Sequence, residues 1–299
     1  MKAAVVAKYG PPEGVQIQEI DVPEPESNEI LIKNHATTVT YGDAALRRMK
    51  FPVRAVFGLF MGGLGKGKVL GHEFAGTIES VGNDVTRFKP GDQVFGSTGM
   101  KGGAHAEYIC LPGDSMVAIK PSTMTFEQAA AIPIGGNTAL HILKGASIQK
   151  GDRVLVYGAS SSVGSYAVQL AKYWGADVTA VCSSTNFDWV QELGATTLID
   201  YRKTDFTQTG EKYNVIFDAV RKLSSSKCKG SLKENGVFLS SRSSTEEKFE
   251  NLSFLRELFE QGKLKAIIDR TFPLEEIVEA HRYVDTGRKK GNVVITVEN

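Results

Sequence analysis

The chain has 299 residues, which is enough for two compact domains or for one large α/β unit. Its 35 basic and 34 acidic side chains give a formal net charge of +1, so no charge excess is present to attract nucleic acid or an anionic membrane. The cysteines are odd in number, far apart and in no CxxC pair, which argues against a disulfide framework: Cys110, Cys182 and Cys228. We therefore expect a cytoplasmic protein whose partner is a small molecule.

Residues 1–123 consist of short β-type runs separated by turn residues. The first residues lack the long apolar core of a signal peptide, which agrees with a cytoplasmic location. The pattern predicts a curled β domain, with strands in these stretches: MKAAVVAKYG, VQIQEIDVP, EILIKNHATTV, EFAGTIESVG, DQVFGS and HAEYICLP.

One uncharged run, AVFGLFMGGLG at residues 55–65, interrupts this β domain. It is much shorter than the roughly 17–25 residues that span a membrane. Phe57, Phe60 and Met61 predict an apolar lid over a substrate, and the glycines among them would let it move. The alternative is an ordinary packed surface loop.

From residue 124 the pattern changes to strands that alternate with helices, which predicts a doubly wound parallel sheet over residues 124–265. The expected strands are Val154–Tyr157, Asp177–Cys182, Thr197–Asp200, Val215–Phe217 and Val237–Leu239. The expected helices are Ser162–Trp174, Phe187–Leu193 and Leu252–Gln261. Residues 266–299 return to strand character around a helix at Leu274–Val284, and we expect them to rejoin the first domain.

Three segments together resemble the medium-chain dehydrogenase/reductase superfamily. They are GHEFAG followed by IESVGNDVTRFKPGDQVFG, the strand, turn and helix around YGASSSVGSYAVQLAKYWGA, and the closing HRYVDTGRKKGNVVI. The resemblance runs from end to end of the chain. It implies an α/β protein with a GroES-like β-barrel domain and a Rossmann domain, and an active site in the cleft between them.

Zinc-ligand residues that this sequence lacks indicate its branch of the superfamily. Zinc alcohol dehydrogenases of this kind bind catalytic zinc through an early cysteine, the GHE histidine and a third ligand before the first Rossmann helix. The resemblance places Thr40 and Ile134 at the first and third positions, and neither fits a tetrahedral nitrogen and sulfur site. The stretch STGMKGGA also lacks the four cysteines of a structural zinc lobe. The chain is thus similar to the zinc-free quinone oxidoreductases and enone reductases, and we expect no metal.

His72 remains from that ligand set. With Asp43 and Glu73 it would form an oxygen-rich metal site without a thiolate, which stays as a minor alternative. We expect His72 instead to line the substrate pocket, held there by a hydrogen bond. The other histidines are expected to be structural: His35, His105, His141 and His281.

The stretch YGASSSVG lies between the first Rossmann strand and its helix, where backbone N–H groups and the helix N-terminus face the phosphates of a dinucleotide. The resemblance places Ala159, Ser161 and Gly164 at the three fingerprint glycines. We predict that the small residues of this turn bind the phosphates: Ser160, Ser161, Ser162 and Val163. The alternative is a turn that has lost tight binding.

The end of the second Rossmann strand reads VCSSTN and lacks the acidic residue that would bind the ribose hydroxyls of NAD. Ser183, Ser184 and Asn186 offer donors that suit a 2′-phosphate. In NADPH-preferring relatives a tyrosine after the next strand lies on the same phosphate, and here that residue is Tyr201, followed by the positively charged Arg202. We predict NADPH over NADH as the cofactor; the alternative is a polar loop without a ligand.

Around the nicotinamide, the resemblance places Thr138 on the first Rossmann helix. It places Val220, Leu239 and Ser240 at the ends of later strands. These positions are expected to offer mostly backbone groups to the carboxamide, with Asn137 as an additional donor.

Without zinc, the substrate's developing charge must be met by hydrogen bonds. Hydride transfer from NADPH to a quinone or an α,β-unsaturated carbonyl fits, because the charge delocalises onto a conjugated oxygen. In TTVTYGDAALRR, a segment that lines the cleft in this family, Tyr41 is the predicted acid or oxyanion donor, assisted by Thr40, while Asp43 orients the loop. The alternatives are an ordinary strand-end aromatic at Tyr41, and a proton supplied by the cofactor ribose or by water.

The segment after Ser241 is short. The family normally has a further apolar strand there, whose edge pairs with a partner subunit, but SSRSSTEEKFENLSFLREL passes almost directly into the last Rossmann helix. Either that strand is deleted or the sequence joins residues across a missing loop. Deletion would weaken a homodimer. A nucleotide-binding sensor without turnover is therefore the alternative to an enzyme, and a zinc alcohol dehydrogenase is the third possibility.

Overall fold

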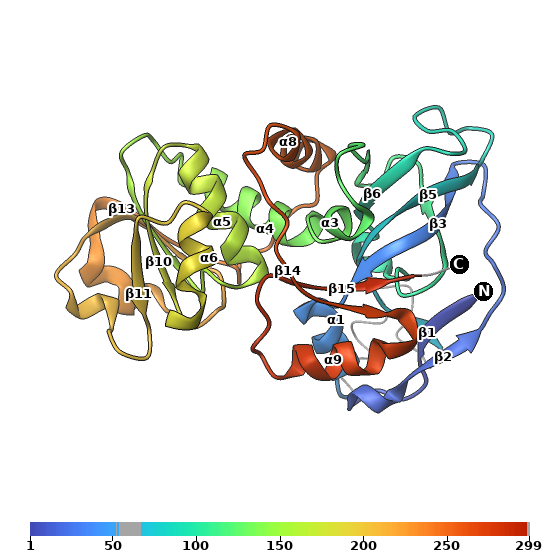
Figure 1. The fold of residues 1–299 in the computed structure, drawn as a ribbon, viewed down its shortest axis with the longest axis horizontal. Coiled ribbons are helices and arrows are strands. Elements are labelled where there is room, and N and C mark those ends of the chain that lie inside the picture. Colours follow the sequence, from blue (N-terminus) through green and yellow to red (C-terminus); the bar gives the residue numbers. More distant parts are fainter. Residues whose placement is uncertain (52, 54–66, 298–299) are drawn as a thin grey trace. The chain divides into compact units, whose positions relative to one another are not determined.

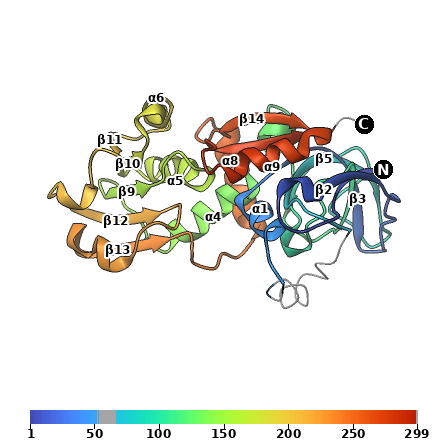
Figure 2. The same ribbon diagram turned by 90° about the horizontal axis from the view of Figure 1, so that it is seen from below.

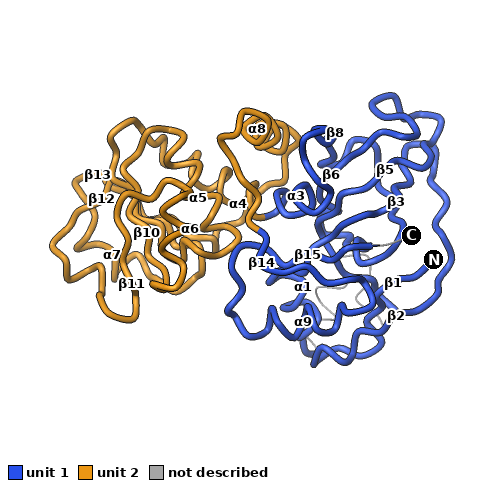
Figure 3. Tube along the Cα trace, viewed as in Figure 1, with its two compact units in different colours: residues 1–134, 268–299 blue, residues 135–267 orange. Residues whose placement is uncertain are grey.

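The computed structural model describes residues 1–51, 53 and 67–297. They form two compact units (Figures 1 and 3). Unit 1 comprises Met1–Ile134 and Ile268–Asn299, and unit 2 comprises Gly135–Ile267. The predicted lid residues Phe57, Phe60 and Met61 lie outside the described residues.

Unit 1 is built on two sheets. In the smaller sheet, β1 (Lys2–Val6) pairs antiparallel with β2 (Val15–Glu19) and β4 (Lys68–Val69). The larger sheet has the strand order β14-β15-β3-β5-β6-β8, with β7 also paired to β3. Its strands are β3 (Glu29–Thr38), β5 (Glu73–Val81), β6 (Gln93–Ser97), β7 (Tyr108–Pro112), β8 (Val117–Ile119), β14 (Ile268–Pro273) and β15 (Asn292–Thr296).

The C-terminal segment completes unit 1, as its strand character suggests. Strand β15 pairs antiparallel with β3, so residues from opposite ends of the chain share one sheet. The helix expected at Leu274–Val284 is present as a 3-10 turn (Leu274–Glu276) followed by α9 (Ile277–Asp285). Ile277 and Ile295 are fully buried and pack in one core cluster with apolar residues of β1.

The first segment of unit 1 extends to Ile134, past the domain boundary predicted at residue 123. Helix α3 (Phe126–Ala130) accounts for the difference, because it packs against β3, β5 and β6 of unit 1. A capping box begins this helix: the Thr125 hydroxyl accepts from the Gln128 backbone N–H at 3.2 Å, and the Gln128 side chain accepts from the Thr125 N–H at 3.0 Å. Helical character alone does not reveal which sheet a helix will cover.

Unit 2 is a five-stranded parallel sheet in the order β11-β10-β9-β12-β13. Its elements are α4 (Pro133–Lys144), β9 (Arg153–Tyr157), α5 (Ser162–Tyr173), β10 (Asp177–Cys182), α6 (Phe187–Glu192), β11 (Thr197–Asp200), β12 (Tyr213–Asp218), α7 (Ser225–Cys228), β13 (Leu232–Ser240) and α8 (Phe249–Glu260). Figure 2 shows α5 and α6 on the same side of the sheet. The order reverses between β9 and β12, and the expected α/β fold with a Rossmann-type sheet is confirmed.

The chain passes from β13 to α8 without a strand in residues 241–248, all of which the structure describes. The side chain of Asn137, on α4, holds this shortened segment. Its amide donates to the Glu246 carbonyl at 3.1 Å, and its carbonyl accepts from Asn251 of α8 at 2.9 Å. The Asn251 carbonyl in turn accepts from Lys144 at 2.7 Å. Because Asn137 and Asn251 are both buried, this polar network depends on every partner being present.

Substitution Asn251→Leu tests the network, because it leaves the buried Asn137 carbonyl without its donor. We expect the free energy of unfolding, measured by urea titration, to fall by about 1–3 kcal/mol. Ser253→Ala, in the same helix, is the matched control and should change it by less than about 0.5 kcal/mol. Equal stability of the Asn251→Leu variant and the wild type would show that the network contributes nothing.

Candidate functional site

In unit 1, Asp43 is the centre of the predicted catalytic segment. Its side chain is fully buried and accepts four hydrogen bonds. Oδ1 accepts from His72 Nδ1 at 2.6 Å and from the Gly71 N–H at 3.0 Å. Oδ2 accepts from the Thr40 N–H at 2.7 Å and from the Thr40 hydroxyl at 2.5 Å. Burial would raise the pKa of Asp43, but the facing His72 and these hydrogen bonds hold it far below its usual range.

A short helix positions this carboxylate. Helix α1 (Tyr41–Arg47) begins at Thr40, whose hydroxyl accepts from the Asp43 N–H at 3.0 Å in a capping box. The sequence pattern does not predict this helix, although Thr-x-x-Asp ahead of AALRR is a helix-start signal. The hydroxyl of Thr40 is thus bonded to Asp43, so its predicted role as an assisting donor is replaced by a structural one.

Tyr41 is the first residue of α1, which corrects its alternative interpretation as the end of a strand. Its residue surface is 60% exposed, and the Arg48 guanidinium lies 5.8 Å from the ring centroid. The phenol therefore sits at the surface of unit 1, where a ligand can reach it. His72 is only 9% exposed. The hydrogen bond between its Nδ1 and Asp43 fixes the orientation of its ring.

Glu73, the residue after His72, faces a different set of partners. Its carboxylate accepts from the Thr38 hydroxyl and from the Ile134 N–H, the latter at 2.7 Å. Burial raises the pKa of Glu73 to about 7, and these two hydrogen bonds oppose the shift. The position that the family resemblance compares with a zinc ligand, Ile134, thus donates its backbone N–H to a protein carboxylate.

The oxygen-rich metal site is not formed in the described part of the chain, where no three His, Cys, Asp or Glu side chains gather in a way that suits a metal ion. Asp43 binds His72 directly, and Glu73 is turned towards Thr38. His105 and His281 are fully buried, as structural residues are, and their rings meet edge to face at 5.8 Å between centroids.

In unit 2, most of the predicted cofactor residues lie at the C-terminal ends of the parallel strands, which we call the carboxyl edge. The turn after β9 begins at Gly158, whose φ of +79° favours glycine. A Cβ atom at Gly164 would lie 2.1 Å from the Gly158 carbonyl oxygen, so only glycine allows α5 to pack this closely on the turn. This geometry fits a dinucleotide phosphate turn.

Ser161 is the N-cap of α5. Its hydroxyl oxygen accepts from the Gly164 N–H at 3.0 Å, so the serine that replaces a fingerprint glycine completes the helix N-terminus. Ser160, Ser162 and Val163 are partly exposed beside it. The backbone of the turn is thus compatible with the predicted phosphate site, while the Ser161 oxygen accepts a hydrogen bond from its own helix.

After the end of β10, Ser184 contacts Asp200 and Arg202, which lie at and just after the end of β11. The Ser183 hydroxyl lies 3.0 Å from the Thr185 hydroxyl. Arg202 forms a two-point ion pair with Asp200, with Nε–Oδ1 at 3.1 Å and Nη2–Oδ2 at 3.0 Å. The same Nη2 donates to the Ser184 hydroxyl at 3.2 Å. These hydrogen bonds hold the pKa of Asp200 well below its usual range. Sequence reasoning gives Arg202 a secondary role and misses that Asp200 fixes its guanidinium.

The other two predicted residues of this edge differ in exposure. Tyr201 is 53% exposed, as a ligand-facing ring requires. Asn186 is buried, and its side-chain oxygen accepts from Trp189 Nε1 at 3.4 Å. The contact uses the oxygen of the Asn186 amide, so its role as a phosphate donor stays a prediction.

Two of the predicted nicotinamide residues are placed by hydrogen bonds. The Val220 N–H donates to the buried Asp218 carboxylate at 3.1 Å, and the Ser240 hydroxyl accepts from the Arg242 N–H at 3.3 Å. Leu239 and Ser240 end β13, so their backbone groups reach the carboxyl edge. Thr138 is partly exposed on α4. Asn137 is corrected from a cofactor donor to a structural residue, because its amide is bonded to Glu246 and Asn251.

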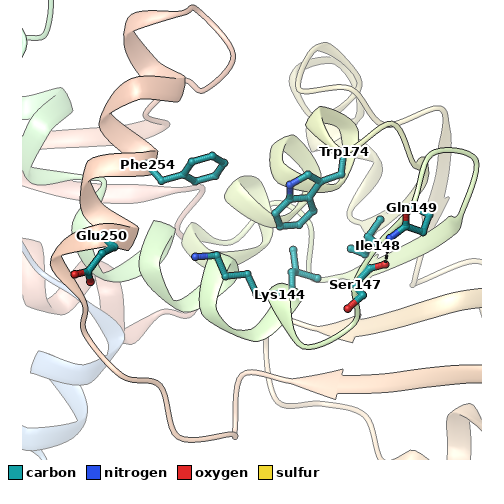
Figure 4. Close-up of a pocket in the computed structure, with 8 residues that line it drawn as sticks. Lys144, Ser147, Ile148, Gln149, Trp174, Glu250 and Phe254 are labelled. Carbon is teal, nitrogen blue, oxygen red and sulfur yellow. Dashed lines mark hydrogen bonds between the residues drawn. The ribbon is translucent and has the colours of Figure 1, made fainter.

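A cavity of about 440 Å³ also opens on unit 2, between α4, α8 and the end of α5. Figure 4 shows the rings of Trp174 and Phe254 beside it, with the Lys144 side chain below them in this view. It is lined by Leu143, Lys144, Ser147, Ile148, Gln149, Trp174, Glu250 and Phe254. None of the sequence-predicted site residues is among these lining residues, so the cavity is separate from the carboxyl edge.

Glu73→Gln tests the burial of the Glu73 carboxyl. Because burial raises the pKa of Glu73 from 4.5 to about 7, its contribution to wild-type stability is complete below about pH 4.5 and is lost as the pH rises towards 7. The difference in unfolding free energy between variant and wild type should shift by about 3 kcal/mol in the variant's favour over this range. Urea titrations from pH 4 to 8 measure it; a difference that does not change with pH would contradict the assignment.

Comparisons with known proteins agree with this architecture. Residues 26–122 match the alcohol dehydrogenase GroES-like domain, and residues 233–295 match a family described as zinc-binding dehydrogenase. The chain is 33% identical to the 2-methylene-furan-3-one reductase of Solanum lycopersicum, covering 99% of this chain and 79% of that protein. It is 30% identical to the chloroplastic NADPH-dependent alkenal/one oxidoreductase of Arabidopsis thaliana, with the same coverage.

Among solved structures, the quinone oxidoreductase of Coxiella burnetii superposes with a TM-score of 0.87 at 28% identity and covers 100% of this chain and 99% of its own. The alignment with the Solanum protein spans 324 positions, more than the 299 residues of this chain, so that protein carries residues that this chain lacks. The likeness to both proteins extends over both units. The chain belongs to the medium-chain dehydrogenase/reductase superfamily, among its quinone and alkenal oxidoreductases.

Proposed function

We propose that the protein is an oxidoreductase that transfers hydride from NADPH to quinones or α,β-unsaturated carbonyl compounds without zinc. One observation carries this proposal: the carboxyl edge keeps a phosphate turn that only glycine permits, while the two positions compared with zinc ligands are committed elsewhere. Thr40 caps α1 against Asp43, and Ile134 binds Glu73 through its backbone. Both features support a protein that binds a dinucleotide and works without zinc.

The named activities of the relatives support the substrate class. One is a 2-methylene-furan-3-one reductase, one an alkenal/one oxidoreductase that depends on NADPH, and one, from Triphysaria versicolor, a quinone oxidoreductase. All three names describe reduction of a conjugated carbonyl system. A neutral carbonyl or quinone is thus the substrate class that we propose for this chain.

Bound NADPH would supply the hydride, and the chain's own residues have three tasks. The turn from Gly158 to Gly164 would hold the diphosphate, Ser183 and Ser184 with the fixed Arg202 would hold the 2′-phosphate, and Tyr41 would donate a hydrogen bond to the substrate oxygen. Charge-assisted hydrogen bonds of this kind are the stronger ones, because one partner is ionised. Asp43 would act as a positioning residue, since it fixes both α1 and the His72 ring.

The cytoplasmic location predicted from the sequence stays a prediction, because the relatives include chloroplastic and mitochondrial proteins. In the described residues no helix combines the length and apolar character needed to cross a bilayer.

A homodimer weakened by the shortened segment after Ser241 is likewise a prediction. The nucleotide-binding sensor stays the alternative to an enzyme, and nothing in the comparisons supports it.

Activity is tested by following loss of nicotinamide absorbance when NADPH is mixed with a panel of quinones and enals. We expect turnover of at least one quinone or enal, unaffected by a zinc chelator, and fewer than about 0.1 zinc per chain by elemental analysis. Absence of turnover with every substrate would leave the sensor alternative, and about one bound zinc per chain would contradict zinc independence.

Tyr41→Phe tests the proton donor. It should lower kcat by about 10²-fold if the phenol supplies the proton, which is the lower end for general acid catalysis.

Arg202→Gln tests cofactor choice, because it removes the guanidinium that Asp200 and Ser184 fix. The dissociation constant of NADPH should rise about tenfold or more, while that of NADH changes little. Lys203→Gln removes the neighbouring exposed charge and is the matched control. Fluorescence titrations with both cofactors give the ratio; an equal effect on NADPH and NADH would contradict a 2′-phosphate site at Arg202.

A further inference from the structure

The sheet of unit 2 reverses its strand order between β9 and β12. In open α/β sheets, ligands bind outside the carboxyl ends of the strands at such a reversal, since the loops diverge there. The loop after β12 contacts the phosphate turn directly: a Cβ atom at Gly158 would lie 2.5 Å from the Val220 side chain. Whatever follows Val220 therefore lies next to the predicted phosphate position.

Arg221 follows Val220. Its φ of +61° lies in the left-handed region, which residues other than glycine adopt at a cost of about 1–3 kcal/mol. This conformation is held by a hydrogen bond from Arg221 Nε to the Ser241 carbonyl, at 3.1 Å. The residue is exposed, so its remaining guanidinium N–H groups are open to solvent at the carboxyl edge.

Arg242 joins the same group from the end of β13. Its Nη2 donates to the Arg221 carbonyl at 2.5 Å, so the two arginines hold each other's loops. Arg242 is also exposed. Within the described part of the chain, neither guanidinium forms an ion pair with a carboxylate, unlike Arg202 with Asp200 or Arg153 with Glu211. Two positive charges thus stand unneutralised beside the strand-order reversal.

We infer that Arg221 and Arg242 form an anion-binding pair that receives a phosphate or carboxylate group of a ligand bound at the carboxyl edge. This inference rests on the proposed function and deepens it, because it adds a charged anchor to a site predicted to recognise neutral substrates. Two arginines with fixed backbones suit an anion, since each offers a planar fork of donors. The anion has two possible sources: the cofactor diphosphate, or a carboxylate on the carbonyl substrate.

The test uses the full chain and the variants Arg221→Gln, Arg242→Gln and their double variant. Lys229→Gln is the matched control, because Lys229 lies just before β13, at the opposite end of the parallel strands. Arg221→Lys keeps the charge and shows whether loss of the fork alone matters. Urea titration establishes that each variant is folded before binding is measured.

Three probes separate the sources. Calorimetry with inorganic pyrophosphate and fluorescence titration with NADPH report phosphate binding without any turnover. Steady-state rates with 3-penten-2-one and with 4-oxo-2-pentenoate, which differ by a methyl against a carboxylate, report a substrate anchor. Since the binding arm needs no catalysis, failure of the proposed activity would not be confused with failure of the anion site.

The double variant should weaken pyrophosphate and NADPH binding at least tenfold relative to Lys229→Gln if the diphosphate is the ligand. If the substrate carboxylate is the ligand, the Michaelis constant for the oxopentenoate should instead rise at least tenfold, while the constant for the neutral enone stays unchanged. Either result supports the pair as an anion site and names its source. Pyrophosphate, NADPH and oxopentenoate values all within twofold of those of Lys229→Gln would overturn it.

Discussion

The close contact between Gly158 and Gly164 is the constraint on which the rest of unit 2 depends. No side chain fits at Gly164, because its Cβ would enter the Gly158 carbonyl, and Gly158 itself has a backbone conformation that other residues avoid. The contact brings the N-terminus of α5 against the end of β9. The loop after β12 also packs against this turn, because a Cβ atom at Gly158 would lie 2.5 Å from the Val220 side chain. Within the turn, Ser161 serves as the cap of α5.

In unit 1, the buried carboxylate of Asp43 organises the predicted catalytic segment. Asp43 is buried and accepts hydrogen bonds from four donors, which stabilises its charge. The carboxylate links the start of α1 to the segment before β5, so Tyr41 and His72 are held by one group. The two positions that the family resemblance compares with zinc ligands, Thr40 and Ile134, form hydrogen bonds within the protein.

Much of the fold can be predicted from the sequence, because strands such as β9 contain a continuous apolar run, Val154–Val156, with a glycine turn signal after it. The short elements escape prediction. Strands β4 and β8 are too brief to show a period, and α1 is visible only through its capping box. Tertiary context decides the remainder: Asn137 resembles a cofactor donor until Glu246 and Asn251, distant in sequence, are seen to bind it. Asn186 differs, because its side-chain oxygen accepts from Trp189, a near neighbour in the sequence.

Hydride transfer is the central claim, and isotope transfer tests it most directly. Protein treated with a chelator and freed of zinc would be mixed with NADPH deuterated at both C4 positions and with 3-penten-2-one, and the product analysed by mass spectrometry. The account predicts 2-pentanone that carries one deuterium on the former β-carbon of the enone. Product without deuterium, or formation of the product only after zinc is restored, would contradict it.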